Sequence, residues 1–149
     1  MVKIIIRKAQ NSDVHGIYLL GQKIQELNFS KKWHFHELSE IKEFIKFKKE
    51  NVFLIAIEDK RIVGFVYAKI LSHHAGGWCM LDNLAVEKHE RQQGIGSELL
   101  HELYLELKKR KVKYVQVLEE IHHKKTRSFW KSKGYRETKT FVWAEKIIN

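Results

Sequence analysis

Residues 79–100 of the chain read CMLDNLAVEKHERQQGIGSELL. The apolar run from Met80 to Val86 predicts a β-strand, and the polar bend after it leads to two glycines, Gly94 and Gly96. Beyond the glycines, apolar residues recur at helical spacing, at Leu99, Leu100, Leu103, Tyr104 and Leu107. The stretch therefore predicts a strand, a turn and an amphipathic helix in direct succession.

The turn between this strand and this helix suits a phosphate or a pyrophosphate. Two glycines separated by one residue remove the Cβ atoms that would keep a ligand from the backbone. The free N–H groups of the first helical turn then point outward at the positive end of the helix dipole. A dinucleotide fingerprint needs a small residue where Leu99 stands, and a Walker A loop needs a Gly-Lys-Ser/Thr sequence that this turn lacks. Both of those phosphate-binding loops are excluded.

Three short patterns resemble those of the GNAT superfamily of acetyl-CoA-dependent N-acetyltransferases. Residues 5–9, IIRKA, together with Asp13 are similar to the usual opening of that family. Residues 91–96, with the pattern R-x-x-G-x-G after a strand, resemble its acetyl-CoA-binding motif, and residues 129–135, FWKSKGY, resemble its F-Y-x-x-x-G-F segment. In this order the resemblance spans essentially the whole chain, and it implies a single N-acetyltransferase domain over residues 1–149.

Length and composition agree with one globular domain. The chain has 149 residues, of which 44% are apolar, so it is long enough to bury a core. Its one cysteine, Cys79, excludes an internal disulfide framework, as expected in a reducing compartment. The apolar run at residues 4–6 is followed at once by Arg7 and Lys8, which is typical of neither a signal peptide nor a membrane span. We therefore expect a cytoplasmic protein without a membrane partner.

The formal net charge is +10, and basic residues gather late in the chain, at Lys108 to Lys113 and Lys124 to Lys133. Such runs are either a solvated surface or a surface that attracts a polyanion, which here means the phosphates of CoA or nucleic acid. Charge alone does not choose between them. A basic nucleic-acid-binding domain is therefore kept as the weakest alternative function.

The rest of the chain alternates strand and helix patterns without a linker or repeat. One helix is expected to begin near Asn11 or Ser12, and three more are expected at about 37–49, 94–110 and 124–133. The expected strands are 3–8, 52–57, 62–71, 78–87 and 112–118, followed by an antiparallel pair at 135–139 and 141–146. This order predicts an α/β fold, with a mixed, mostly antiparallel sheet of six to seven strands flanked by about four helices. The resemblance implies the same GNAT-like acyl-CoA N-acyltransferase fold.

The resemblance also implies how acetyl-CoA is bound. In the GNAT family the strand before the motif splays from its neighbour, and the pantetheine arm pairs with the exposed backbone edge. The amides at this edge belong to Leu84, Ala85 and Val86, with the Leu84 N–H as the oxyanion donor. Arg91 assists as a charge, or is simply solvated. The pyrophosphate is held by the amides of Gln92, Gln93, Gly94, Ile95, Gly96 and Ser97.

The implied reaction is attack of a neutral amine on the thioester, which requires removal of a proton from the amine. Asp82 is the first candidate base, because some polyamine-acetylating members of the family carry Glu at this position. The alternative is a carboxylate that only orders the strand or binds a cationic substrate. His34, His36 and His73 are further candidates because His titrates near neutrality, although each also fits a plain surface role.

Two positions depart from the family pattern. Trp130 follows Phe129 where the family commonly has Tyr as the acid for the leaving thiolate, and an indole cannot supply that proton. CoA thiolate is a stable leaving group, so this acid is helpful and not obligatory, and Tyr135 or another hydroxyl can substitute. Trp130 and Phe129 are expected to pack on the cofactor. His123 stands about where many members have an Asn that bonds the pantetheine. The alternative function is a GNAT-like CoA-binding module with weak or no transfer activity.

The acceptor is expected to be a primary amine whose identity stays open: a small amine or polyamine, an aminoglycoside-like compound, a protein N-terminus or a lysine. We expect it to enter between the loops at 28–36 and 72–77 and the last hairpin. The resemblance further implies a homodimer formed through the C-terminal strands. No metal is expected, because the consecutive pairs His73-His74 and His122-His123 point different ways on a regular element.

Overall fold

The computed structural model describes residues 3–28, 35–72 and 77–148. The chain divides into two compact units, residues 1–117 and 118–149, and each is described by itself. The elements are, in chain order, β1 (Ile5–Lys8), η1 (Asn11–Asp13), α1 (Val14–Lys23), η2 (Gln25–Leu27), α2 (Leu38–Lys46), β2 (Asn51–Glu58), β3 (Arg61–Ser72), β4 (Trp78–Val86), η3 (Lys88–Glu90), α3 (Ile95–Lys109), β5 (Tyr114–Val117) and α4 (Lys124–Ser132).

The first unit is built on one sheet with the strand order β1-β2-β3-β4-β5. Strands β1 to β4 are joined by antiparallel pairing, whereas β5 pairs parallel to β4. A parallel pair needs a long crossover, and α3 supplies it between β4 and β5. The expected mixed, mostly antiparallel α/β sheet with four α-helices is confirmed. The expected number of six to seven strands is wrong, since the described residues form five.

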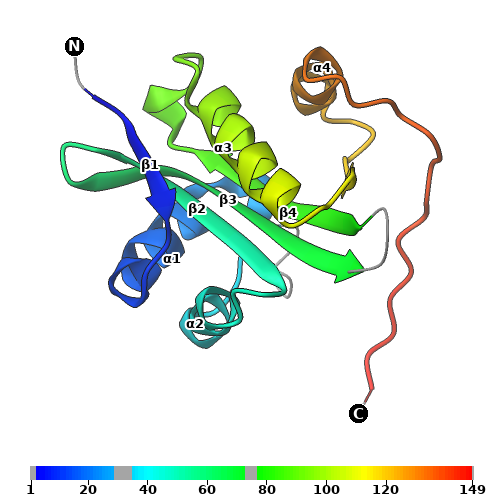
Figure 1. The fold of residues 1–149 in the computed structure, drawn as a ribbon. Helices are drawn as coiled ribbons and strands as arrows, with labels where there is room; N and C mark the ends of the chain where they lie inside the picture. Colours follow the sequence, from blue (N-terminus) through cyan, green and yellow to red (C-terminus); the bar gives the residue numbers. More distant parts are fainter. Residues whose placement is uncertain (1–2, 29–34, 73–76, 149) are drawn as a thin grey trace. The chain divides into compact units, whose positions relative to one another are not determined.

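Helices cover both faces of this sheet, with α1 and α2 on one face and α3 on the other (Figure 1). On the α1 and α2 face, Ile17 and Ile41 pack with Phe53 and Phe65 in one buried cluster. On the α3 face, Gly64 of β3 lies so close to α3 that an added Cβ would be 3.2 Å from a methyl of Leu99. These two apolar layers hold β3 and β4 between them. The position of β4, which carries Asp82, is therefore fixed by packing on both faces.

The two C-terminal strands expected at 135–139 and 141–146 are not present. Residues 135–148 form no helix or strand, and Phe141, Val142 and Trp143 are 74%, 92% and 78% exposed. These residues have high strand propensity, but a strand also needs a partner that accepts its backbone hydrogen bonds, and propensity does not specify that partner. The absence of these two strands explains why the described residues form fewer strands than predicted.

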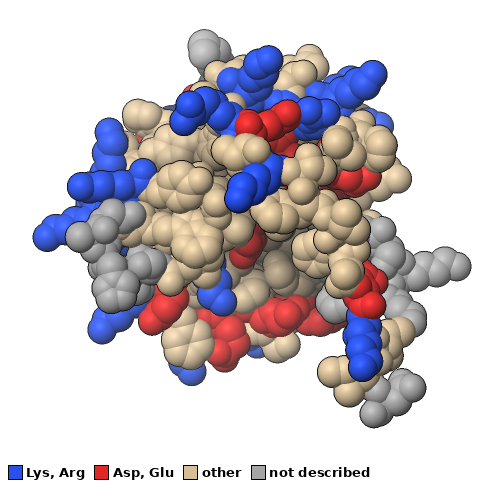
Figure 2. Space-filling model, turned by 90° about the vertical axis from the view of Figure 1, so that its right-hand side faces the viewer, with Lys and Arg blue, Asp and Glu red and all other residues tan. Residues whose placement is uncertain are grey.

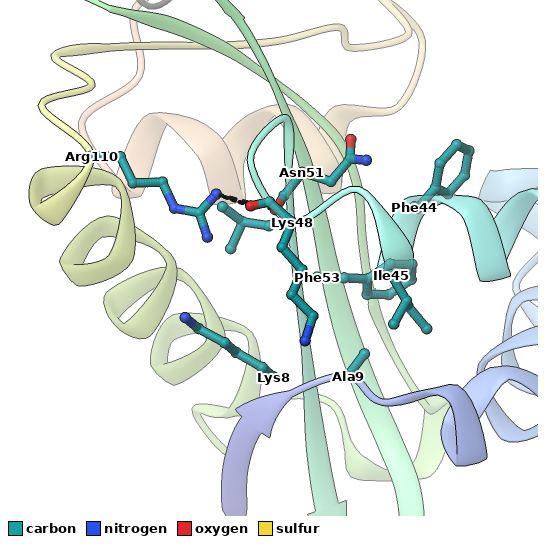
Figure 3. A pocket seen from close by; sticks show the side chains of 9 residues that line it. Lys8, Ala9, Phe44, Ile45, Lys48, Asn51, Phe53 and Arg110 are labelled. Atoms are coloured by element: carbon teal, nitrogen blue, oxygen red, sulfur yellow. Dashed lines mark hydrogen bonds between the residues drawn. The ribbon is translucent and has the colours of Figure 1, made fainter.

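An ion-pair cluster joins the end of α3 to β1 and to the loop before β2. Glu106 accepts hydrogen bonds from Lys8 Nζ at 2.9 Å and Arg110 Nη2 at 2.9 Å. Burial raises the pKa of Glu106, but these hydrogen bonds outweigh it and hold the pKa below its usual range. Arg110 also donates to the Lys48 carbonyl at 2.6 Å, across a cavity of about 40 Å³ (Figure 3). A cavity of this size holds at most a few waters, so it is too small for a cofactor such as CoA.

Two glycines of α1 give a matched test of the packing. A Cβ at Gly21 would overlap the Phe35 ring, whereas a Cβ at Gly16 would lie 2.8 Å from the terminal methyl of Ile62, which can rotate away. Alanine favours a helix over glycine by about 1 kcal/mol. We expect Gly21→Ala to lower the free energy of unfolding by about 1–3 kcal/mol through overpacking. Gly16→Ala should leave it unchanged or raise it by up to about 1 kcal/mol. Urea unfolding of both variants measures the difference, and equal effects would contradict the Phe35 packing.

Candidate active site

The candidate site begins where β4 loses one of its two neighbours. Strand β5 pairs with β4 only from Trp78 to Leu81. At the next residue the pairing with β3 is also irregular, because Leu81 lies opposite Ala68 and Asn83 lies opposite Tyr67. Asp82 is therefore the extra residue of a β-bulge, which bends a strand and increases its twist. The bulge coincides with the point beyond which β4 pairs with β3 alone.

The hydrogen bond at the end of β4 shows which amides face the uncovered edge. Glu87 N–H donates to the Val63 carbonyl of β3 at 2.8 Å, so this amide points toward β3. Amides alternate in direction along a strand, which turns the Ala85 amide toward β3 and the Leu84 and Val86 amides away from it. The Leu84 and Val86 N–H groups therefore lie on the side that β5 leaves uncovered, whereas the Ala85 amide, expected at the same edge, faces β3.

The turn into α3 has the geometry of an anion-binding site. Gln92 and Gly94 have φ angles of +64° and +85°, in the left-handed region. Glu98 N–H makes the first intrahelical bond, to the Gly94 carbonyl at 3.0 Å, so the amides of residues 95–97 have no acceptor within the helix. An added Cβ at Gly94 would meet no atom within 4 Å, so the open turn is accessible to a ligand. Left-handed residues before a helix N-terminus form a concave set of N–H donors.

Arg91 is held by the protein itself. Its Nε donates to the Val86 carbonyl at 3.0 Å, and its Nη1 lies 3.1 Å from Glu26 Oε1 in η2. The contact with Val86 agrees with the alternation above, which points that carbonyl to the uncovered edge. The guanidinium therefore connects the end of β4 to the segment after α1, and it fixes the start of the anion-binding turn.

Asp82 has a raised pKa. The carboxylate is solvent-accessible, but the surrounding protein reduces its hydration and raises its pKa above the ordinary value, while the positive charges of His36 and Lys69 oppose this rise. Desolvation and the Asp82 charge together raise the pKa of the Tyr67 hydroxyl and raise that of the buried Cys79 thiol to about 11. Tyr67 and Cys79 are therefore neutral at physiological pH, which leaves Asp82 as the carboxylate among these three groups that can act as a base.

Aromatic rings pack beside this carboxylate on the α2 side of the sheet. The His36 imidazole contacts the Phe44 ring edge-on at a centroid distance of 4.8 Å, and Phe44 stacks on Tyr67 at 4.4 Å. Of the three candidate histidines, the structure therefore places His36 in the electrostatic environment of Asp82. His34 and His73 lie outside the described residues.

The remaining predicted cofactor residues belong to the second unit. His123 precedes α4, with Nδ1 at 3.5 Å from Glu120 Oε2. The Trp130 ring makes edge-on contacts with the rings of Phe129 and Tyr135, at centroid distances of 5.2 and 5.0 Å. Their part in binding the cofactor stays a prediction.

Figure 2 shows both Lys or Arg and Asp or Glu side chains on the face that it presents, so that face is not uniformly basic. Within the described ranges, no cluster of three or more His, Cys, Asp or Glu side chains is arranged to hold a metal ion. The same described helices include none that is long and apolar enough to cross a membrane.

These features define a class of α/β protein in which an extended ligand can pair with the uncovered edge of a strand, while the phosphates of that ligand bind at a helix N-terminus. Residues 49–137 match the family described as "Acetyltransferase (GNAT) domain". The uncharacterised N-acetyltransferase YhfO of Bacillus subtilis (strain 168) is 30% identical over 142 residues, covering 92% of this chain and 93% of YhfO. The chain therefore belongs to the GNAT family, and it is an acetyl-CoA-dependent acetyltransferase.

Solved structures agree in fold. Aminoglycoside N-acetyltransferase AAC(6')-Iy in complex with CoA has a TM-score of 0.81 at 16% identity, with 98% of this chain and 96% of the other covered. A transcriptional regulator from Bacillus halodurans C-125 has a TM-score of 0.79 at 18% identity, with coverage of 97% and 100%. At this level of identity the likeness extends to the fold, and the same fold is shared by proteins described in different functional terms.

Sequence reasoning missed two features of this site. The bulge at Asp82 depends on the register between β4 and β3, which the β4 sequence alone does not specify. The Glu26 partner of Arg91 lies 65 positions away in the chain. The Gly-x-Gly pattern was the signal that located the turn, and no comparable pattern marks either of these two features.

Proposed function

We propose that this protein transfers the acetyl group of acetyl-CoA directly to a primary amine, with the site formed by the uncovered half of β4 and the turn into α3. The observation that carries the proposal is the direction of the Leu84 and Val86 amides, toward the edge that β5 does not cover. The pantetheine arm pairs with this edge. The amides of Gln92 to Ser97 bind the pyrophosphate at the positive end of α3.

The chemistry is a single displacement at the thioester carbon. The neutral amine forms a C–N bond to that carbon, and the carbonyl oxygen becomes an oxyanion that accepts a hydrogen bond from Leu84 N–H. The nitrogen, positively charged after the attack, releases a proton to water, the C–S bond breaks, and CoA leaves as a thiolate that takes a proton from water. Because Trp130 cannot supply that proton, the step depends on the intrinsic stability of the thiolate.

Asp82 is the base in this proposal. A raised pKa brings a carboxylate closer to the pH at which it works, which improves general base catalysis. Asp82 lies two residues before Leu84 on the bulged, uncovered part of β4, so the proton acceptor and the oxyanion donor come from one short segment. The proton moves from the acceptor ammonium to the Asp82 carboxylate, directly or through water.

Charge restricts the class of acceptor. The structural neighbours include aminoglycoside acetyltransferases, whose acceptors carry several amines. This chain has a formal net charge of +10, and Lys69 acts as a positive charge on Asp82. A polycation is repelled by such a field, whereas an amine with one positive charge is repelled much less. We therefore favour a monoamine acceptor, with the aromatic side chains near His36 available to an apolar substituent.

The test is a calorimetric titration of the protein with acetyl-CoA, followed by a thiol-release assay with a panel of amines. The panel contains benzylamine, spermidine, kanamycin and a peptide with a free N-terminus. We expect stoichiometric binding, and thiol release that depends on the added amine and is faster with benzylamine than with the polycations. Absence of binding would contradict the proposed cofactor site, and faster turnover of kanamycin would contradict the monoamine assignment.

A further inference from the structure

A cavity of about 550 Å³ opens on the first unit, between the start of α1 and the turn that joins β2 to β3. Its volume lies within the range of small-molecule sites in proteins. The described residues that line it belong to β1, η1, α1, β2, this turn and β3, and none of them to β4 or to the turn into α3. The cavity is therefore separate from the proposed site of acetyl transfer.

The floor of the cavity is apolar. Ile57 of β2 and Ile62 of β3 line it and are half-buried, so part of each side chain still meets solvent. Gly16 of α1 lies against Ile62, since an added Cβ would be 2.8 Å from its terminal methyl. A larger side chain at Gly16 would have to enter the cavity or push Ile62 into it. Because burial of apolar surface is favourable, a hydrocarbon group that covers the two isoleucines is stabilised there.

Basic residues outnumber acidic ones around this floor. Arg7, Lys60 and Arg61 line the cavity together with one acid, Asp13. Asp13 already accepts hydrogen bonds from Arg7 Nη1 at 2.7 Å and Arg7 Nη2 at 2.9 Å. The Arg7 hydrogen bond holds the pKa of Asp13 below its usual range, so this pair stays ionised and its two charges cancel. The surplus of positive charge therefore comes from Lys60 and Arg61.

Lys60 and Arg61 are exposed and form the rim of the cavity beside the turn. Arg61 Nη2 lies 3.4 Å from Glu90 Oε1 and 3.9 Å from Glu58 Oε2. Both separations exceed the length of about 2.7–2.9 Å that a strong charge-assisted hydrogen bond has, so the guanidinium can still bind a further anion.

The backbone of Lys60 is strained. Glu58 pairs with Arg61, so Asp59 and Lys60 form a two-residue hairpin turn, in which glycine is the usual second residue. Lys60 instead has a φ of +66°, in the left-handed region. Strained non-glycine residues concentrate at functional sites. A binding role for the Lys60 side chain would explain why a lysine occupies this position.

We propose that this cavity binds a small monocarboxylate with an apolar body. The carboxylate accepts hydrogen bonds from Lys60 and Arg61 at the rim, and the hydrocarbon part covers Ile57 and Ile62 on the floor. A small inorganic anion uses only the rim, and an uncharged hydrocarbon uses only the floor, so a molecule with both parts binds best. This inference does not depend on the transfer reaction proposed above.

The test is an amide-resolved NMR titration of the full chain with 4-phenylbutanoate. Acetate has the same charged group without the apolar body, and 4-phenylbutanamide has the same body without the charge. We expect saturable shifts at the amides of Gly16, Lys60 and Ile62, and a Kd at least about fivefold lower for 4-phenylbutanoate than for either partial probe. No saturable shift at these amides, or equal binding of a partial probe, overturns the inference. Displacement of 4-phenylbutanoate by acetyl-CoA also overturns it, because the probe would then occupy the transfer site.

Lys60→Gly and Lys111→Gly are matched variants. Lys111 is also exposed and left-handed, with a φ of +60°, and it does not belong to the described lining of the cavity. Each substitution removes one positive charge and one strained side chain, so we expect similar changes in Tm. Only Lys60→Gly should weaken 4-phenylbutanoate binding, by about fivefold or more. Equal Kd values for the two variants overturn the role of Lys60 and with it the inference.

Gly16→Leu tests the floor of the cavity independently of the rim. Leucine is a good helix former, and its side chain at this position competes with the ligand for the space above Ile62. We expect the folded variant to bind 4-phenylbutanoate at least about tenfold more weakly and to bind acetyl-CoA as the wild type does. Wild-type affinity for 4-phenylbutanoate in folded Gly16→Leu overturns the inference, and the comparison of Lys60→Gly with Lys111→Gly decides it if this variant does not fold.

Discussion

Replacement of Asp82 by Asn is expected to lower kcat by about 10²- to 10⁴-fold, which is the usual contribution of a positioned general base. The side-chain amide keeps the shape of the carboxylate but cannot accept the proton of the ammonium. The affinity for acetyl-CoA, measured by calorimetry, should stay within about twofold because the base does not hold the cofactor. Stability should not fall either. Since the folded protein raises the pKa of Asp82, the ionised carboxylate destabilises the fold at pH values above that pKa.

The pH dependence gives a second signature of the same residue. The kcat/KM for the acceptor should decrease as the pH falls through the raised pKa of Asp82, and Asp82→Asn should remove this acid limb. Lys69 lowers the pKa of Asp82, so Lys69→Met should move the limb to higher pH. Lys69 is exposed, so its effect should be small and should shrink as salt is added. If Asp82→Asn turns over at the wild-type rate, Asp82 has only a structural role. If the acid limb of the pH profile is unchanged in Asp82→Asn, another group is responsible for that limb.

The parts of the fold that sequence predicts well are those governed by local periodicity. The strand expected at 78–87 is Trp78–Val86, and the helix expected at 94–110 is Ile95–Lys109. Apolar spacing along one element determines which of its faces is buried, so its type and approximate ends follow from nearby residues alone. The expected turn between the two elements follows in the same way from Gly94, whose left-handed angle most other residues adopt only with strain.

The parts that sequence did not predict depend on pairing between distant segments. The bulge at Asp82 arises from the match of Leu81 with Ala68 and of Asn83 with Tyr67, a register set by two strands together. The prediction of two C-terminal strands was wrong for the same reason. Their residues favour an extended backbone, but the sequence does not specify which strand they would pair with. The cavity beside the turn between β2 and β3 is likewise a property of the packed protein. The resemblance supplied the roles of Asp82 and Leu84, and those roles stay predictions.

Gly94→Glu is expected to weaken acetyl-CoA binding by at least about a hundredfold. At Gly94 the turn is open, so a larger side chain fits the protein and instead occupies the space of the ligand. The glutamate also sets a negative charge against a pyrophosphate. At about 4 Å and the effective dielectric constant of a protein surface, each pair of like charges costs about 4 kcal/mol, or roughly a thousandfold in affinity. Calorimetric titration with acetyl-CoA measures the loss.

Two further variants separate this charge from backbone strain. Gly94 has a φ of +85°, so every side chain there costs about 1–2 kcal/mol of stability. Gly134, just after α4, has the same φ of +85° and also has no atom within 4 Å of an added Cβ. Gly134→Glu therefore carries the same strain and the same charge after the C-terminal end of α4 instead of before the N-terminal end of α3. We expect it to lower the Tm about as much as Gly94→Glu and to retain acetyl-CoA binding, while Gly94→Ala should keep most of the affinity. If Gly94→Glu binds acetyl-CoA as tightly as Gly134→Glu does, the turn into α3 does not hold the pyrophosphate.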